Sequence, residues 1–139
     1  MIFYTDGSAH PNPGPGGFGV VIVGQRGEVL ETYSKHFDYT TNNEMELLAI
    51  LYAVCRAARE GESALIYSDS AYAINTCSNW MFSWQKNKWL KSDGKTPENL
   101  DIVKAIFDIN NIIDINFIKV KGHSTNPYNQ LADKLASTV

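Results

Sequence analysis

Four carboxylate side chains stand next to apolar residues, where water would have poor access to them: Asp6, Glu46, Asp69 and Asp133. Buried carboxylates repel one another, so one of a close group must stay protonated unless a cation binds. Carboxylate oxygens are hard ligands that suit Mg²⁺ or Mn²⁺, and a pair of such ions about 4 Å apart drives phosphodiester chemistry. If the fold brings these acids together, they predict a two-metal site in which Asp6 is the candidate to bridge both ions.

Each acid, taken alone, also has a purely structural explanation. Asp6 could close a turn by bonding the backbone two residues on, and Glu46 could favour the dipole of its helix. Asp69 could cap the following helix, and Asp133 could pair with a neighbouring lysine. The choice depends on where the surrounding elements place the four side chains.

The elements that must position these acids follow from hydrophobic periodicity and turn signals. Apolar runs between turn residues predict strands, and apolar residues at helical spacing, such as Met45 and Leu48, predict helices. Thr41 or Asn42 can cap the helix that carries Glu46. We expect strands at residues 2–9, 18–24, 29–40, 63–69 and 114–120. We expect helices at about 40–60, 70–77, within the Trp/Lys segment 80–95, at 97–110 and at 126–137.

The order of these elements predicts a single α/β domain over residues 1–139 with a mixed sheet. Three consecutive strands favour an antiparallel meander, whereas the two later strands, each reached through helices, favour parallel crossovers. Helices then flank the sheet, and its first and fourth strands are neighbours. Because ligands bind at the carboxyl ends of the strands in such sheets, Asp6 and Asp69 should lie side by side there.

A basic, tryptophan-rich block occupies residues 80–95 of an otherwise acidic chain. The chain has a net charge of −3, yet this block holds four lysines against one aspartate, and the remaining residues carry −6. Such a block can be no more than a solvated face. Here, however, cations alternate with aromatic rings, a combination that suits a nucleic-acid backbone and its sugars. The block therefore predicts a binding surface that includes Trp80, Trp84, Lys86, Lys88, Trp89 and Lys91.

Length and composition set further limits. The 139 residues, 44% hydrophobic and 19% charged, fit one globular domain. There is no apolar run of 18 residues and no basic N-terminal region followed by an apolar run, so neither a membrane span nor a secretory signal is expected. The two cysteines lack metal-type spacing and predict reduced thiols, with Cys55 packed in a helix. We expect a cytoplasmic protein.

Six motifs occur in the order and at about the spacing of type 1 ribonuclease H, which the chain resembles over essentially its whole length: DGSAHPNPGPGG, TTNNEMEL, YSDSAY, NWMFSWQKNKW, KVKGHS and NQLAD. The resemblance implies the ribonuclease H-like fold, a five-stranded sheet with three antiparallel and then two parallel strands. It implies a monomeric endonuclease that hydrolyses the RNA strand of RNA–DNA hybrids and leaves 5′-phosphate and 3′-hydroxyl ends. It also implies two Mg²⁺ ions when substrate is bound, with Mn²⁺ able to substitute.

The resemblance assigns chemical roles to five residues. Four acids match the family's metal ligands: Asp6, Glu46, Asp69 and Asp133. His123, in the sequence Gly122-His123-Ser124, matches a histidine thought to assist proton transfer and product release. Without the resemblance, His123 would be interpreted as a surface loop residue.

The resemblance also implies a surface for the substrate. Asn12, Asn42 and Asn43 match residues that meet the minor groove of the hybrid. Thr41 and Asn99 match a pocket for a phosphate of the DNA strand, although Asn99 could equally start a helix. The aromatic groove beneath the DNA strand is matched by Tyr72 and Trp80, residue types that are also common in a plain core. The block at 80–95 matches the family's basic protrusion.

The chain departs from the family pattern in three places. Ala71 stands where relatives often carry Gln or Met, so we expect one minor-groove interaction to be missing. Glu44 adds a negative charge two positions before Glu46, but about 200° round the helix, so it should point away. The chain starts directly at its first strand, without the N-terminal hybrid-binding domain of some relatives, so processive binding is not expected.

Two other functional classes stay open at the level of sequence. An inactive hybrid-binding module would keep the lysines and tryptophans but would not need four acids. Another nuclease or polynucleotidyl transferase of the same fold, such as a 3′–5′ exonuclease or an integrase, would share the acids. It would lack the Trp/Lys protrusion and the Asn42-Asn43 pair.

Overall fold

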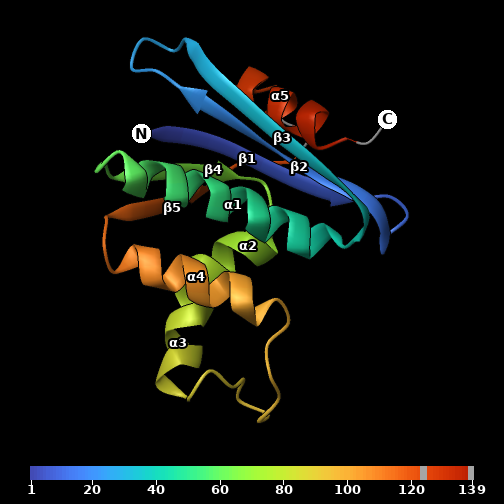
Figure 1. Ribbon diagram of the computed structural model, residues 1–139, viewed down its shortest axis with the longest axis vertical. Helices are drawn as coiled ribbons and strands as arrows, with labels where there is room; N and C mark the ends of the chain where they lie inside the picture. Colours follow the sequence, from blue (N-terminus) through green and yellow to red (C-terminus); the bar gives the residue numbers. More distant parts are fainter. Residues whose placement is uncertain (123–124, 138–139) are drawn as a thin grey trace.

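The computed structural model describes residues 1–122 and 125–137, which build a sheet flanked by helices (Figure 1). The strands are β1 (Ile2–Ala9), β2 (Gly14–Val23), β3 (Val29–Thr40), β4 (Ala64–Ser68) and β5 (Ile115–Lys119). The helices are α1 (Asn42–Arg59), α2 (Ala71–Asn75), the π-helical turn η1 (Thr76–Trp80), α3 (Met81–Lys86), α4 (Leu100–Asn110) and α5 (Pro127–Ala136).

The five-stranded sheet is mixed, and this confirms the predicted fold class. The strand order is β3-β2-β1-β4-β5. β2 pairs antiparallel with both β1 and β3, whereas β4 pairs parallel with both β1 and β5. The central strand β1 and its neighbour β4 therefore run in the same direction and end at the same edge of the sheet.

The two faces of the sheet bury separate hydrophobic clusters. Phe3 and Ile66 pack in a cluster with Leu47 of α1, whereas Tyr4 packs in a second cluster with Ala132 of α5. Successive residues of a strand point to opposite faces, so Phe3 and Tyr4 serve different helices. Figure 1 shows α1 in front of β1, and α5 behind β2 and β3.

The helix that carries Glu46 begins where the sequence predicts. Thr41 is its N-cap, and the Thr41 hydroxyl accepts a hydrogen bond from the backbone N–H of Glu44 at 3.1 Å. The Glu44 carboxylate in turn accepts a hydrogen bond from the Thr40 hydroxyl. Glu44 is thus engaged at the end of β3, as expected from its position on the helix.

The segment after α2 is less helical than expected, and left-handed residues explain why. α3 ends at Lys86, and Lys88 and Trp89 have φ angles of 57° and 62°. α4 begins at Leu100 rather than near 97, after Asn99 at φ 57°. A left-handed residue cannot continue a right-handed helix. Residues 87–99 therefore form a loop, which extends away from the sheet in Figure 1.

The cysteines differ from each other in environment. Both are free, but Cys55 is exposed on α1 and Cys77 is buried. The expectation that Cys55 is packed is therefore wrong, because its position lies on the outer face of α1. None of the helices within residues 1–122 and 125–137 is long and apolar enough to cross a membrane.

Candidate active site

Three of the four predicted acids meet at the edge where β1 and β4 end. Thr5 pairs with Ser68 in the parallel register of these strands, so Asp6 and Asp69 follow next to each other. Glu46 reaches them from α1, and carboxylate oxygens of the three residues lie within 4.8 Å of one another. The structural explanations for Asp6 and Asp69 as separate turn and cap residues do not account for this convergence.

Gly7 explains how Glu46 comes so close. A Cβ atom built on Gly7 would lie 2.3 Å from the carbonyl carbon of Met45 and 2.4 Å from the backbone nitrogen of Glu46. Any side chain at this position would therefore push α1 away from β1. A glycine inside a strand often marks such a close approach of two backbones.

Asp133 approaches Asp6 from the opposite face of the sheet. Gly19 is the cross-strand partner of Asp6, and a Cβ atom on Gly19 would lie 2.5 Å from the carbonyl oxygen of Ala132. α5 therefore packs directly on the backbone of β2, and the Asp133 carboxyl is near enough to contribute to the raised pKa of Asp6. Asp133 is exposed, however, and it does not belong to the tight group of three.

Both ends of α5 are fixed by side chains. At its start, the side-chain oxygen of Asn126 accepts hydrogen bonds from the backbone N–H groups of Tyr128 and Asn129 at 2.9 and 3.1 Å. At its end, Nε2 of His36 on β3 lies 3.2 Å from the carbonyl oxygen of Leu135. These contacts set the position of the helix that carries Asp133.

The three clustered acids form a site of unbalanced negative charge. Burial, the Asp69 charge and the nearby Asp133 carboxyl together raise the pKa of Asp6 from 3.8 to about 8. Burial, followed by the charges of Asp6 and Asp69, raises the pKa of Glu46 well above its usual 4.5. Oε1 of Glu46 is buried and has no hydrogen-bond partner among the described residues.

These features fit a bound divalent cation. The donor set is made of carboxylate oxygens only, which suits Mg²⁺ and Mn²⁺. A buried carboxylate oxygen without a partner is costly, and a cation would supply the missing partner for Glu46. A cation would also neutralise the repulsion that raises the pKa of Asp6. The acid cluster can therefore support metal-assisted chemistry.

The predicted histidine, His123, lies outside the described residues. The residue before it, Gly122, is described, and a Cβ atom built there would lie 3.9 Å from Oδ2 of Asp69. The chain therefore passes beside the acid cluster immediately before position 123.

The three predicted minor-groove asparagines gather around the start of α1. Oδ1 of Asn42 accepts a hydrogen bond from the backbone N–H of Ala9 at 2.6 Å, and Oδ1 of Asn12 accepts one from the backbone N–H of Asn42 at 3.1 Å. Nδ2 of Asn43 donates to Oε1 of Glu98 at 3.0 Å. The loop after β1, the first turn of α1 and the segment before α4 are thus joined by polar side chains.

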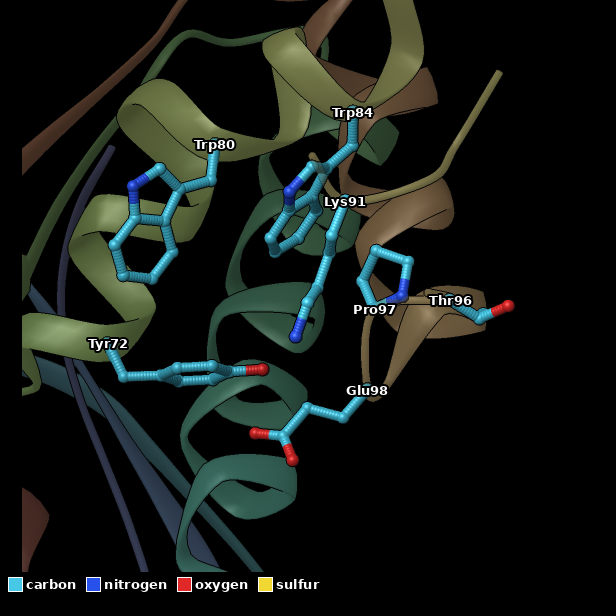
Figure 2. A pocket seen from close by; sticks show the side chains of 7 residues that line it. All are labelled: Tyr72, Trp80, Trp84, Lys91, Thr96, Pro97 and Glu98. Atoms are coloured by element: carbon cyan, nitrogen blue, oxygen red, sulfur yellow. The ribbon is translucent and has the colours of Figure 1, made fainter. Parts of the chain in front are cut away.

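An open pocket of about 370 Å³ lies between α2, α3 and the loop before α4 (Figure 2). Three aromatic rings face this space, those of Tyr72, Trp80 and Trp84. The ring centres of Trp80 and Trp84 are 6.2 Å apart. The Lys91 ammonium points into the pocket toward Tyr72 and Glu98 in Figure 2. Aromatic rings with a cation between them provide a surface suited to sugars, bases and phosphates.

Two predicted phosphate-pocket residues have other contacts in the structure. The Thr41 hydroxyl caps α1. Nδ2 of Asn99 donates to the Tyr72 hydroxyl at 3.4 Å, and Asn99 also lines a second pocket of about 490 Å³ together with Glu44. Asn99 therefore connects the aromatic pocket to the acidic start of α1.

The remaining residues of the basic block lie on its outer side. Lys86 and Lys88 are exposed. The Trp89 ring packs edge-on against Phe107 of α4, with ring centres 5.2 Å apart, and Nζ of Lys104 lies 5.6 Å from its centre. Trp89 thus anchors the loop to α4, while Trp80 and Trp84 line the pocket.

Sequence reasoning missed three residues that shape this region: Gly7, Gly19 and Glu98. The two glycines carry a signal, because each lies inside a predicted strand. Glu98 carries none, since its bond to Asn43 joins residues that are 55 positions apart.

Comparisons with known proteins agree with this site. The family model described as RNase H matches residues 1–139. The ribonuclease H of Caldanaerobacter subterraneus subsp. tengcongensis is 44% identical over 135 residues, which cover 96% of this chain and 86% of that protein.

Two solved structures show the same fold. The RNase H domain of PFV, solved in solution, superposes with a TM-score of 0.83 at 28% identity and covers 97% of this chain and 90% of that one. LC11-RNase H1, solved with an RNA/DNA hybrid, gives a TM-score of 0.73 at 27% identity, with 97% and 92% coverage. Taken with the carboxylate cluster at the end of β1 and β4, these likenesses establish that the chain belongs to the ribonuclease H family.

Proposed function

We propose that this ribonuclease H hydrolyses the RNA strand of RNA–DNA hybrids at internal positions and leaves 5′-phosphate and 3′-hydroxyl ends. The observation that carries the proposal is the convergence of Asp6, Glu46 and Asp69 within 4.8 Å at the carboxyl edge of two parallel strands. The aromatic pocket lined by Tyr72, Trp80 and Trp84, which begins on the helix that follows Asp69, gives a nucleic-acid strand a place to lie.

The metal ligands in this proposal are Asp6, Glu46, Asp69 and Asp133, and the ions are two Mg²⁺ when substrate is bound, with Mn²⁺ able to substitute. Held by these carboxylates, divalent ions would supply activation of the attacking water and stabilisation of the leaving 3′-oxygen. Asp6, central among the acids, is the ligand proposed to bridge the two ions. Asp133, exposed and close to Asp6, is suited to complete the set when substrate arrives.

His123 is proposed to move a proton at the reacting phosphate and to assist release of the product. Support comes from its neighbour Gly122, which lies beside Asp69. A histidine near its ordinary pKa can both accept and donate a proton near neutral pH.

Substrate binding is assigned to two groups of residues. Asn12, Asn42 and Asn43, at the start of α1, would contact the minor groove, where ribose 2′-hydroxyls distinguish RNA from DNA. The DNA strand would lie over the pocket and protrusion, in contact with Thr41, Tyr72, Trp80, Trp84, Lys86, Lys88, Lys91 and Asn99, while Trp89 would support the loop from α4. Because most of these contacts go to sugars and phosphates, cleavage should depend little on sequence.

The protein is further proposed to act as a monomer in the cytoplasm. Its two cysteines are free thiols, as a reducing compartment would keep them. Light scattering of the purified chain, alone and with hybrid, would test the monomer.

The decisive test is cleavage of three matched duplexes, namely RNA–DNA hybrid, duplex RNA and duplex DNA, each with Mg²⁺ and with EDTA. Only the RNA strand of the hybrid should be cut, and only with Mg²⁺. A hybrid with blocked or joined ends should be cut equally well, whereas an exonuclease needs a free end.

The matched control is Asp6→Asn, which keeps the size of the side chain and removes one charge. Cleavage should fall by orders of magnitude, because cation positioning supplies most of the catalysis, while hybrid binding survives. Activity above roughly a tenth of wild type in this variant would contradict the proposed site.

A further inference from the structure

Glu98 occupies a bridging position that the acid cluster does not require. Its carboxylate accepts the hydrogen bond from Nδ2 of Asn43 at 3.0 Å. Asn43 lies in the first turn of α1, three residues before Glu46, whereas Glu98 lies in the loop that leads to α4. Figure 2 shows the Glu98 carboxylate directed into the pocket that Tyr72 lines.

The backbone around Glu98 is held firmly in place. Pro97 is buried before it. Asn99 follows it in the left-handed conformation, with φ 57° and ψ 30°, which asparagine tolerates better than most residues other than glycine. The side-chain amide of Asn99 donates a hydrogen bond to the Tyr72 hydroxyl. The backbone carbonyl oxygen of Asn99 accepts hydrogen bonds from the backbone N–H groups of Ile102 and Val103 at 3.1 Å. Glu98 therefore offers Asn43 a fixed partner.

The chemistry of this contact fixes which end of the Asn43 amide is free. A carboxylate only accepts hydrogen bonds, so it selects the NH₂ end of the amide and turns the carbonyl oxygen away. No hydrogen bond to Oδ1 of Asn43 occurs within the described part of the chain. The side chain thus presents its acceptor oxygen, while one of its two N–H donors is engaged by Glu98.

We infer that Glu98 is a positioning residue that sets the polarity of the Asn43 amide, so that Asn43 accepts a hydrogen bond from a donor in the minor groove of the hybrid. The inference rests on the proposed function, since it requires a hybrid over the start of α1. A minor groove offers two such donors, the 2-amino group of guanine and the ribose 2′-hydroxyl. Other base edges there present only acceptors, which the Asn43 oxygen would repel.

Glu98 also places a negative charge in the pocket that contains Lys91. This charge would oppose a phosphate, so loss of Glu98 has two separate effects on binding. Loss of the charge should strengthen binding of every hybrid, whereas loss of the acceptor should remove discrimination between hybrids. An affinity ratio between two hybrids cancels the first effect and isolates the second.

The experiment measures Kd by fluorescence anisotropy in EDTA for three hybrids of one sequence. The first is unmodified, the second has hypoxanthine for every guanine and so lacks the 2-amino groups, and the third has 2′-fluoro groups for the 2′-hydroxyls. The wild-type chain should bind one of the two modified hybrids about three- to tenfold more weakly than the parent, the range for one hydrogen bond. The hybrid that loses affinity identifies the donor.

Five variants then test the role of Glu98. Glu98→Gln keeps an acceptor oxygen without the charge and should keep the wild-type ratio. Glu98→Ala and Asn43→Ala should each lower the ratio to the same smaller value, which belongs to the other minor-groove contacts. The double variant should lower it no further, as expected for two residues that act as a unit. Asp101→Asn removes an equal charge from the first turn of α4 without a contact to Asn43, and it should keep the ratio.

Equal affinity of the wild type for all three hybrids would overturn the inference, and so would a wild-type ratio in Glu98→Ala. Because the measurement is binding, it stays decisive if the chain cuts no hybrid. A failure to cut any hybrid would contradict the proposed function and leave the inference about Glu98 intact.

Discussion

A Cβ atom on Gly7 would lie 2.4 Å from the backbone nitrogen of Glu46, so the glycine that follows Asp6 sets how closely α1 approaches β1. The acid cluster depends on this approach, because Glu46 is the only one of its three members that comes from a helix. A missing side chain on the strand thus controls the position of a carboxylate on the helix.

Gly7→Ala should therefore damage both stability and catalysis. The added methyl group meets backbone rather than a flexible side chain, and overpacking of this kind costs about 1–3 kcal/mol or more. Chemical denaturation and hybrid cleavage measure the two effects. Gly61→Ala is the matched control: Gly61 has φ 68° and nothing within 4 Å, so it should lose about 1 kcal/mol while kcat/KM stays at the wild-type value. Equal loss of activity in both variants would contradict the role given to Gly7.

The metal-free protein should become less stable as pH rises. The pKa of Asp6 is raised from 3.8 to about 8 in the folded chain, so between these values the folded state holds a proton that the unfolded state has lost. The stability that this proton supports is complete below pH 3.8 and is lost as pH rises through about 8. Thermal unfolding in EDTA across this window measures the fall. Asp6→Asn, or Mg²⁺ with the wild type, should flatten it, and an unchanged slope in Asp6→Asn would assign the fall to other groups.

Replacing Lys86, Lys88 and Lys91 by Ala should raise KM for long hybrids and leave kcat comparatively intact. These lysines lie outside the acid cluster, so they would contribute binding that is equal in the ground and transition states. For each lysine that no longer binds a phosphate, the log–log salt slope should fall by roughly one unit or slightly less. Arg26→Ala, on the exposed turn between β2 and β3, is the control for general charge. If the slopes of the triple variant and wild type coincide, the lysines are a solvated face.

Trp84→Ala and Trp89→Ala should have different consequences, although both rings belong to the basic block. Trp84 lines the open pocket and also packs against the core, so its loss should raise KM in addition to lowering the free energy of unfolding. Trp89 packs on Phe107 and under Lys104, so its loss should cost about 2 kcal/mol of stability. Urea denaturation and KM measured on both variants separate these roles. The distinction fails if Trp89→Ala raises KM as strongly as Trp84→Ala at unchanged stability.

His123→Ala should slow turnover without abolishing it. A positioned proton-transfer group contributes about 10²–10⁴-fold, and water can replace part of that contribution. The loss should be smaller than in Asp6→Asn, and the pH dependence of kcat should lose the limb that belongs to the histidine. Equal inactivity of the two variants would give His123 a stronger role than proton transfer alone.

The convergence of Asp6 and Asp69 could be predicted from sequence because it follows from topology. β4 runs parallel to β1, so Asp69, which directly follows β4, lies next to Asp6 inside β1. The position of Glu46 could also be predicted, because the spacing of the apolar residues around it shows which face of α1 packs on the sheet. These three positions depend on local periodicity and on the order of elements, which a single sequence carries.

Other features depend on contacts that no local pattern encodes. Trp89 leaves the helical pattern because Lys88 and Trp89 itself turn left-handed, although tryptophan and lysine favour no such conformation. The place of Asp133 outside the tight cluster depends on how α5 settles over Gly19 and under His36. These outcomes are set by tertiary packing, so only the structure reveals them.

The loop at residues 87–99 begins and ends on helices, and its Trp89 ring holds it to α4, whereas the clustered acids come from β1, α1 and the end of β4. The proposed catalytic and substrate-binding residues are thus encoded by different stretches of one chain. Evolution could change the length or the charge of the loop at residues 87–99 without altering the acid cluster. Protein engineering could do the same by inserting a different binding loop between Lys86 and Leu100, with the acid cluster unchanged.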